Sequence, residues 1–545
     1  MKANFIFKGN AIFDSVSEKP FLGFVAIREN KIIAVREGHS TLMDFADDNT
    51  RIIECEDRLI TAGFIDAHMH FFDGIFQNSR FMCRDLFPCK SAAECVATIG
   101  AFAKAHPEYE RITGMGWFIP LWDDPTPPTK DMLDAIEPDR PVYLMCADGH
   151  SFWLNSKALE ESKVDPDRKL LFGEIEKNEK GEANGVMHEL DACAPCTVNA
   201  QRMPEKERIE LIIDFVSTLS KNGITATTDM AVLPTAIPVT EELKAVKRLE
   251  EEGRFNLRLN LYPPLGTTAD FGVVKEYDSL FTSDKLRVAG LKAFVDGVHG
   301  NHTALVIEPY NDMPGHCGES FYSHEMYMSQ VLAANRAGFG VKLHCCGEGA
   351  VEWALDAYEN ANKQLPNNSV RNSIEHVEAL RSEQAIRFTA NDVTATMQPL
   401  HLMYEGDILD TILGAERAKN QYAIKTMIDE GINVAFSSDY PVAEFNPFIN
   451  IYFAVTRCDR EGNPVEKNST QAIGVADAIK AYTLGSAYCM GMEQKIGTLE
   501  EGKLADILVL DRNLFTSKPQ DILDTNVELT MVDGVIAHND LFKEA

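Results

Sequence analysis

Short apolar runs alternate with amphipathic segments through the middle of this 545-residue chain. The runs read as buried strands and lie at residues 140–146, 224–229, 257–262, 290–295, 340–344, 373–376, 393–397 and 432–436. The segments between them, such as 206–221 and 241–252, carry apolar residues at helical spacing. About eight strands that alternate with helices indicate an α/β fold, and they favour a (β/α)8 TIM-like barrel over an open sheet.

Both ends of the chain show a different pattern, with short strands separated by turn residues. Neither end is large enough to bury a core alone. We therefore predict a small composite β-sandwich, built from residues 1–58 and 490–545, beside a barrel at 59–489. The connection at about residues 73–205 is far longer than a strand-to-helix loop requires, and it predicts an inserted subdomain that shapes the substrate pocket.

Polar residues stand at the ends of successive apolar runs. His68 and His70 close the run that begins at Leu59, and side chains two residues apart on a strand share one face. Later runs carry or precede Lys292, His344, His376 and Asp439. The carboxyl ends of barrel strands ring one mouth, so we expect these six residues to converge. Imidazole and carboxylate groups together are typical of a transition-metal site.

Composition narrows the classes of partner. The chain has 83 acidic and 52 basic residues, a formal net charge of -31, which disfavours nucleic acid and anionic membrane surfaces. No segment approaches the roughly 20 apolar residues of a membrane span, and the N-terminus lacks a signal-peptide pattern. We therefore expect a cytoplasmic protein with twelve reduced cysteines, a small-molecule substrate and, as one candidate assembly, a homodimer. The Cys193–Cys196 pair has no second pair and no redox-domain pattern around it.

The strand-end segments around His68, Lys292, His344, His376 and Asp439 resemble motifs of the amidohydrolase superfamily. The resemblance is to amidohydrolase family 3, the branch that includes N-substituted formamide deformylases and exoenzyme regulators. The similar segments are 63–70 (the first-strand motif), 291–297 (the strand with a carboxylated lysine), 344–348 (His-x-x-Gly-Asp), 374–376 (Glu-His) and 437–442 (Ser-Asp-x-Pro-Val). Features of the branch include Gly116-Trp117, His150 with Trp153, and 397–399 with His401. The resemblance covers essentially the whole chain.

The resemblance implies a metal-dependent hydrolase acting on a C–N bond other than a peptide bond (EC 3.5), of the amide or N-formyl type. It implies a metal-activated hydroxide with Asp439 as general acid and base. His68, His70 and Asp439 would hold one Zn²⁺ or another divalent transition metal. His344 and His376 would hold a second, and Lys292, carboxylated by CO₂, would bridge both. His376 is also a candidate to stabilise the oxyanion.

Substrate contacts are expected from Trp117, His150, Trp153, His302 and His401. The substrate itself does not carry over from relatives, because this chain departs from the family near the pocket. Glu348 stands where aspartate is common, and residues 296–304 bring in His299 and His302 where a Gly-Ser segment is usual.

Several alternatives stay open from the sequence. Trp117 and Trp153 fit the core of the inserted subdomain equally well. Lys292 could instead pair with an acid such as Asp296 beside a single metal. The same site could hydrolyse an ester, lactone or cyclic amide, or deaminate a ring. A last alternative is not an enzyme: a metal-binding barrel that has lost catalysis and serves a regulatory role.

Overall fold

The computed structural model describes residues 1–147, 149, 151–170, 173–230, 241–465 and 469–542. The chain divides into two compact units. Unit 1 comprises Met1–Phe71 and Ile212–Ala545, and unit 2 comprises Phe72–Leu211. His150 lies outside the described residues.

Two parallel sheets form the centre of unit 1, in the orders β14-β13-β12-β5 and β15-β16-β17-β18-β19. Their strands are β5 (Phe64–Asp66), β12 (Ile224–Met230), β13 (Arg258–Tyr262), β14 (Leu286–Val288), β15 (Gly290–Phe294), β16 (Gly340–Cys345), β17 (Asn372–His376), β18 (Val393–Met397) and β19 (Val434–Phe436). Only Ala289 separates β14 from β15, so these two segments together count as one barrel strand. The two sheets therefore supply the eight strands of the barrel. The result is the TIM-barrel-like α/β fold that the sequence pattern predicts.

Backbone hydrogen bonds connect the two sheets at both seams. Ala67 N–H donates to Phe436 O at 3.2 Å, and Lys292 N–H donates to Pro263 O at 3.0 Å. No continuous strand ladder joins β19 to β5 among the described residues. Short links therefore bring the carboxyl ends of the first and last barrel strands together.

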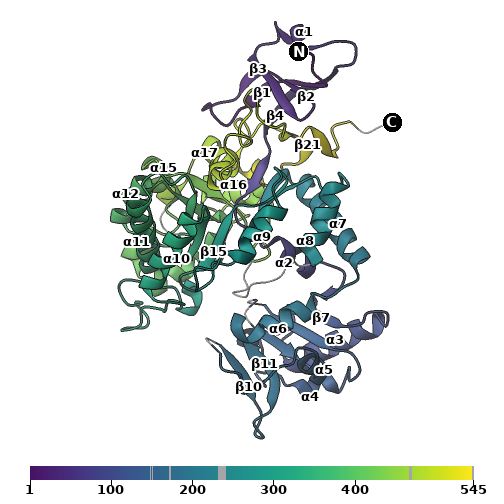
Figure 1. The fold of residues 1–545 in the computed structure, drawn as a ribbon, viewed down its shortest axis with the longest axis vertical. Helices are drawn as coiled ribbons and strands as arrows, with labels where there is room; N and C mark the ends of the chain where they lie inside the picture. Colours follow the sequence, from purple (N-terminus) through teal and green to yellow (C-terminus); the bar gives the residue numbers. More distant parts are fainter. Residues whose placement is uncertain (148, 150, 171–172, 231–240, 466–468, 543–545) are drawn as a thin grey trace. The chain divides into compact units, whose positions relative to one another are not determined.

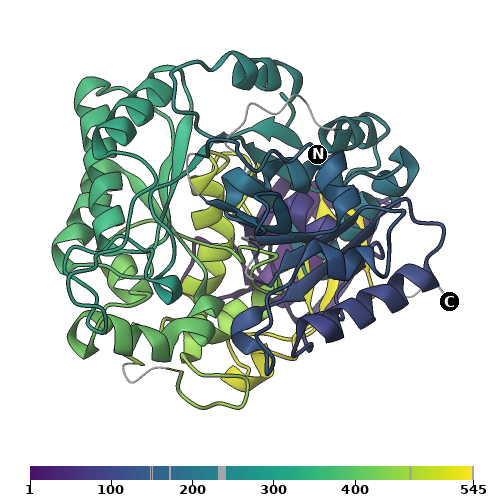
Figure 2. The ribbon, with the colours of Figure 1, turned by 90° about the horizontal axis from the view of Figure 1, so that it is seen from below.

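Helices follow most of the barrel strands and pack outside them (Figures 1 and 2). They are α7 (Glu205–Lys221), α8 (Glu241–Glu251), α9 (Gly272–Leu280), α10 (His324–Arg336), α11 (Glu348–Gln364), α12 (Ser382–Asn391), α13 (Leu402–Ile412), α14 (Ala415–Ala418), α15 (Ile424–Asp429), α16 (Pro447–Thr456), α17 (Val475–Lys480) and α18 (Ser486–Cys489). Helix α11 shows why they pack this way: it buries Val351, Ala354, Leu355 and Tyr358, which lie on one helical face.

Strands from both chain ends form one seven-stranded sheet, in the order β22-β21-β20-β4-β1-β2-β3. They are β1 (Phe5–Phe13), β2 (Phe21–Arg28), β3 (Lys31–Glu37), β4 (Arg51–Ala62), β20 (Ile507–Leu510), β21 (Val527–Val532) and β22 (Val535–Asn539), with the short helix α1 (Leu42–Phe45) before β4. Leu508 of β20 lies opposite Thr61 of β4. Strand β4 continues past residue 58, and only Gly63 separates it from the barrel strand β5.

Unit 2 has its own six-stranded sheet, in the order β10-β11-β9-β8-β7-β6. Its elements are β6 (Met82–Cys83), β7 (Ile112–Trp117), β8 (Val142–Cys146), β9 (Ser151–Leu154), β10 (Glu174–Lys177), β11 (Ala183–His188), α3 (Ala92–Ala105), α4 (Lys130–Asp134), α5 (Ser156–Glu161) and α6 (Leu190–Ala200), and α2 (Phe71–Gln77) begins where unit 1 ends. Our assignment of the 140–146 run to the barrel is therefore wrong. That run is β8, which is apolar on both faces because each face of the sheet carries a separate core cluster.

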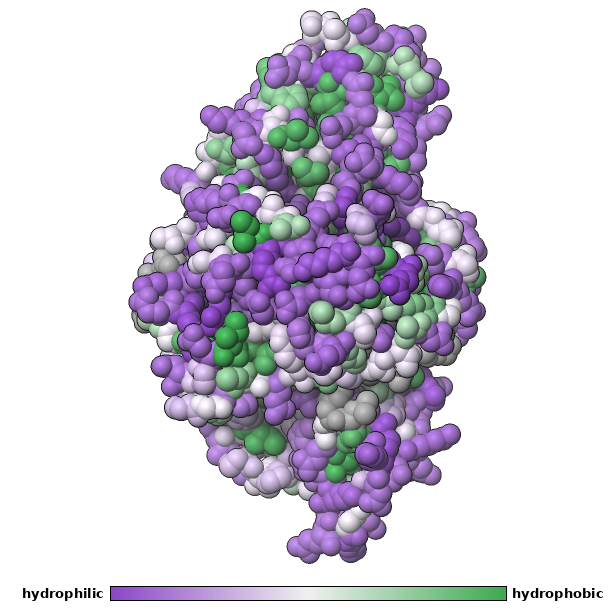
Figure 3. Space-filling model, turned by 60° about the vertical axis from the view of Figure 1, so that its left-hand side comes forward, coloured by the Kyte–Doolittle hydropathy of each residue, from purple (hydrophilic) through white to green (hydrophobic). Residues whose placement is uncertain are grey.

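The surface of the molecule is largely polar. Polar side chains prevail on the face drawn in Figure 3, with apolar residues in small separate groups. Within the described ranges, none of the helices combines the length and the apolar character needed to cross a bilayer.

Candidate metal centre

The barrel of unit 1 brings the six predicted ligand residues together. Asp439 Oδ1 lies 3.3 Å from His68 Nε2 and 3.3 Å from His70 Nε2. Lys292 Nζ lies 3.4 Å from His68 Nε2, and the rings of His344 and His376 have centroids 4.2 Å apart. Five of the six are buried, and the side chain of His70 is 12% exposed. The convergence expected from strand-end positions is present.

Hydrogen bonds fix how three of the imidazoles face this centre. The Nδ1 atoms lie beside acceptors: Glu375 Oε2 at 2.6 Å for His68, Met230 O at 2.8 Å for His70, and Gln398 Oε1 at 3.0 Å for His376. Each Nδ1 therefore carries the proton, and each Nε2 presents a lone pair. In this tautomer His376 presents an acceptor to the centre, and its role in stabilising an oxyanion stays a prediction.

The groups that meet here repel one another unless a cation joins them. His376 Nε2 and Asp439 Oδ1 are buried, and within the described residues neither has a hydrogen-bond partner. Two further Nε2 lone pairs, from His68 and His70, face the same Asp439 oxygen. Buried acceptors without donors cost free energy, so a divalent cation fits this donor set.

Burial and neighbouring charge keep these groups in their ligand forms. Burial and the nearby Lys292 lower the pKa of His344 to about 3, and burial with His344 lowers the pKa of His376 well below its usual range. Burial alone would raise the pKa of Asp439, but the neighbouring His68 and His70 rings lower it well below its ordinary value when their Nε2 atoms carry a proton, and a cation in the same place acts in the same direction. Neutral imidazoles beside an ionised carboxylate are the states that bind metal.

The backbone at two ligands is strained. His376, Val377 and Asp439 have φ values of +75°, +48° and +58°, a region that residues other than glycine seldom occupy. Glu375 and His376 are adjacent, yet both contact His68, because the left-handed backbone at His376 breaks the alternation of the strand. Such strain costs on the order of 1–3 kcal/mol per residue and is typical of functional sites.

The structure adds buried residues behind the ligands that sequence reasoning did not assign. The Asp66 carboxylate accepts hydrogen bonds from Ser438 Oγ at 2.6 Å, Ser438 N–H at 3.2 Å and His68 N–H at 3.2 Å. Burial raises the pKa of Asp66 to about 7. Glu375 supports His68 in turn, with Lys342 behind it at 3.2 Å. One signal was available: a charged residue inside an otherwise apolar strand.

A family model described as the amidohydrolase family matches residues 51–538 of this chain. The chain belongs to the amidohydrolase family. This amidohydrolase is 29% identical to Protein LONG AFTER FAR-RED 3 of Arabidopsis thaliana, over 98% of this chain and 91% of that protein. It is 23% identical to the N-substituted formamide deformylase of Arthrobacter pascens, over 93% of each chain.

A solved structure supports the fold of the amidohydrolase. An uncharacterized metal-dependent hydrolase from Pyrococcus horikoshii matches with a TM-score of 0.77 at 23% identity, covering 94% of this chain and 99% of that one. At this identity the likeness concerns the fold alone, and it agrees with the barrel described above.

Asp296 has a structural role in the amidohydrolase. Its carboxylate accepts hydrogen bonds from the backbone N–H groups of Leu305 at 2.8 Å, Cys346 at 3.1 Å and Gly347 at 2.9 Å. These hydrogen bonds engage both oxygens of the carboxylate. We therefore interpret the cluster of Asp296 with His344 and Cys346 as a structural link between two loops. The alternative ion pair of Lys292 with Asp296 does not occur among the described contacts.

The tryptophans predicted to contact substrate are core residues of unit 2. Trp117 and Trp153 are 2% and 0% exposed, and their rings pack edge to face. Their indole N–H groups donate to Leu144 O and Thr129 O, both at 2.9 Å. Both indoles are buried, which favours the alternative of a role in the core of unit 2, and their contact with substrate stays a prediction.

The two remaining pocket histidines differ. His302 faces both carboxylate oxygens of Asp312, at 3.1 and 3.0 Å, and its role in substrate binding stays a prediction. His401 stacks beside His376 with ring centroids 6.3 Å apart, and its buried Nε2 has no hydrogen-bond partner in the described part of the chain. His401 is thus the predicted substrate residue that adjoins the centre.

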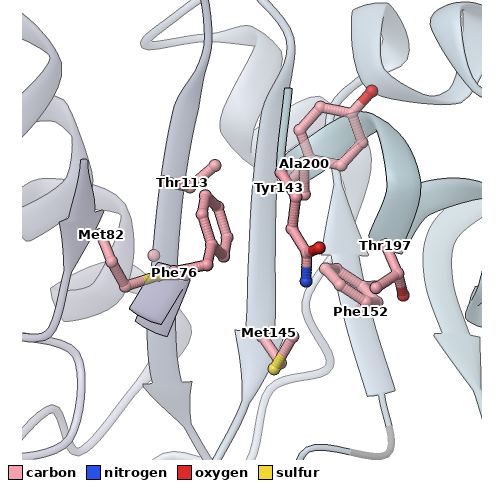
Figure 4. A pocket seen from close by; sticks show the side chains of 10 residues that line it. Phe76, Met82, Thr113, Tyr143, Met145, Phe152, Thr197 and Ala200 are labelled. Atoms are coloured by element: carbon pink, nitrogen blue, oxygen red, sulfur yellow. The ribbon is translucent and has the colours of Figure 1, made fainter. Parts of the chain in front are cut away.

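A small pocket within unit 2 offers no comparable chemistry (Figure 4). It is too narrow to hold a water molecule, and it is lined by Phe76, Met82, Thr113, Gly114, Tyr143, Met145, Phe152, Thr197, Ala200 and Gln201. None of these is a predicted ligand or catalytic residue. Most belong to or adjoin the apolar core of that unit.

Proposed function

We propose that this amidohydrolase is a metal-dependent hydrolase that cleaves a C–N bond other than a peptide bond, of the amide or N-formyl type. The observation that carries the proposal is the convergence of two imidazole nitrogens, from His68 and His70, on the buried carboxylate of Asp439. The formamide deformylase relative, similar over nearly its whole length, is named for an amide of this kind.

The donors divide into two sets. His68, His70 and Asp439 have ligand atoms within 4.8 Å of one another and form the first. We assign His344 and His376 to the second, with Lys292 as a bridge once it is carboxylated, because an ammonium cannot bind a cation. Burial lowers the pKa of Lys292 to about 8, which favours the neutral amine that reacts with CO₂. Nitrogen and oxygen donors of this kind suit Zn²⁺.

The chain's own residues supply the proton transfers. When bound, a divalent transition metal supplies Lewis acidity that lowers the pKa of a coordinated water towards about 7. Asp439 would accept a proton as water attacks the substrate and would return it to the leaving nitrogen, since its carboxylate is ionised and buried. His401 offers a buried ring nitrogen to a polar group of the substrate.

The test combines elemental analysis with a substrate panel. We expect one to two equivalents of transition metal in the purified protein, and turnover of at least one amide or N-formyl compound. Asp439→Asn is expected to lower kcat by about 10²–10⁴-fold, whereas Asp511→Asn, at the end of a terminal-sheet strand, leaves it unchanged.

Three results would redirect the proposal. Activity that persists without metal in excess chelator overturns the mechanism. Faster turnover of esters, lactones, cyclic amides or ring amines changes the reaction class. Metal binding without turnover anywhere in a broad panel favours a non-catalytic, regulatory barrel.

A further inference from the structure

A buried ion pair lies in the barrel interior beside the candidate metal centre, and the proposed chemistry does not use it. Lys342 Nζ on β16 lies 3.2 Å from Glu375 Oε1 on β17, and the side chains are 1% and 0% exposed. Removing two charges from water costs several kcal/mol per ion, and an apolar pair of similar size would often be as stable. The stability of the barrel alone therefore does not explain why these charges are present.

Glu375 divides its two oxygens between the pair and a metal ligand. Oε2 accepts the hydrogen bond from His68 Nδ1 at 2.6 Å. Oε1 accepts hydrogen bonds from Lys342 Nζ at 3.2 Å and from Ser373 Oγ at 2.5 Å. A carboxylate turns easily about its last torsion, and donors on Oε1 hold it so that Oε2 faces His68.

Lys342 also reaches the backbone beside the same ligand. Its ammonium donates to Ala67 O at 3.2 Å, directly before His68, and to Cys489 Sγ at 3.1 Å. The three donors of the ammonium are thus used by three buried acceptors. Two of these acceptors, Glu375 and Ala67, adjoin His68, one through its side chain and one through its main chain.

We propose that Lys342 is a positioning residue for His68: it locks the Glu375 carboxylate and the Ala67 carbonyl so that His68 Nε2 faces the cation. The inference rests on the proposed metal-dependent function. It predicts that Lys342 affects metal affinity chiefly through Glu375, since partners behind a metal-binding histidine typically change affinity 10–100-fold.

The experiment measures Zn²⁺ dissociation constants by competition with a chelator of known affinity, for the unmodified protein, Lys342→Met, Glu375→Gln and the double variant. We expect each single variant to bind about 10–100-fold more weakly. The double variant should bind no more weakly than Glu375→Gln, because the amide still accepts from His68 and no buried charge is left unpaired. This comparison does not require Lys342→Met to fold.

Arg258→Met is the matched control for lost stability. Arg258 is a buried cation that pairs with Asp506 at 2.7 and 2.8 Å, near the opposite strand ends. The Arg258→Met variant should have a lower melting temperature and an unchanged zinc affinity. Two results would overturn the positioning role while leaving the proposed function standing. One is a zinc affinity of Glu375→Gln equal to that of the unmodified protein. The other is a double variant that binds zinc a further tenfold more weakly than Glu375→Gln. If the unmodified protein binds no transition metal, both proposals fail.

Discussion

Replacement of Asp66 by alanine tests how the first and last barrel strands are held together at the candidate centre. The side chain is fully buried and accepts three hydrogen bonds, two from Ser438 and one from His68. Ser438 precedes the proposed ligand Asp439, and His68 is itself a proposed ligand. The variant therefore removes a link between two segments of the candidate centre without replacing a proposed ligand.

The magnitude follows from the bonds that are lost. Because burial raises the pKa of Asp66 to about 7, part of the population is neutral at pH 7, and each bond counts as roughly 1 kcal/mol. The Ser438 hydroxyl can turn to another acceptor, but the two backbone N–H groups cannot. We expect Asp66→Ala to lower the free energy of unfolding by about 3 kcal/mol and to weaken zinc binding.

Urea unfolding of the metal-free protein measures the first effect, and chelator competition measures the second. Asp66→Asn keeps one carbonyl oxygen for the two N–H groups, so its expected cost is about 1 kcal/mol. Ser438→Ala removes the hydroxyl bond to Asp66 and the acceptor of Tyr440 N–H at 3.1 Å, so its expected cost is about 2 kcal/mol. An Asp66→Ala protein within about 0.5 kcal/mol of the unmodified chain, with unchanged zinc affinity, would refute the reasoning.

Three further predictions concern other parts of the molecule. Trp153→Ala should destabilise unit 2 by about 3–5 kcal/mol, seen as faster proteolysis within residues 72–211; lost activity with unaltered proteolysis would return Trp153 to the substrate pocket. Burial lowers the pKa of His299 to about 4. The neutral imidazole therefore contributes fully to stability above about pH 6.5, and this contribution, up to about 3 kcal/mol, is lost as the pH falls through about 4. His299→Gln should lose less stability than the unmodified protein between these pH values in urea titrations; an equal loss contradicts this. Chelation should lower the melting temperature, since metal at 1,000 times its Kd adds about 4 kcal/mol; an unchanged melting temperature would argue against a bound cation.

The alternation of strands and helices was sufficient to predict the barrel, because most strands between Ile224 and Phe436 are short, buried and followed by a helical segment. The same signal failed at Val142–Cys146. A strand that is buried on both faces has a similar composition in any sheet, so its membership depends on contacts far away in sequence. The tryptophans of unit 2 were ambiguous for the same reason.

The sequence was sufficient to predict that the proposed ligand residues converge, but it did not show how they meet. Strict alternation along β17 would direct Glu375 and His376 to opposite faces, although both contact His68. The left-handed φ angles at His376 and Val377 resolve this conflict. A β-branched valine avoids that conformation when it is free to do so, so surrounding contacts must impose it. Glu375 thus supports the proposed ligand His68, while the adjacent residue His376 is itself a proposed ligand. Local backbone strain makes both possible, and the spacing of residues along the sequence does not predict such strain.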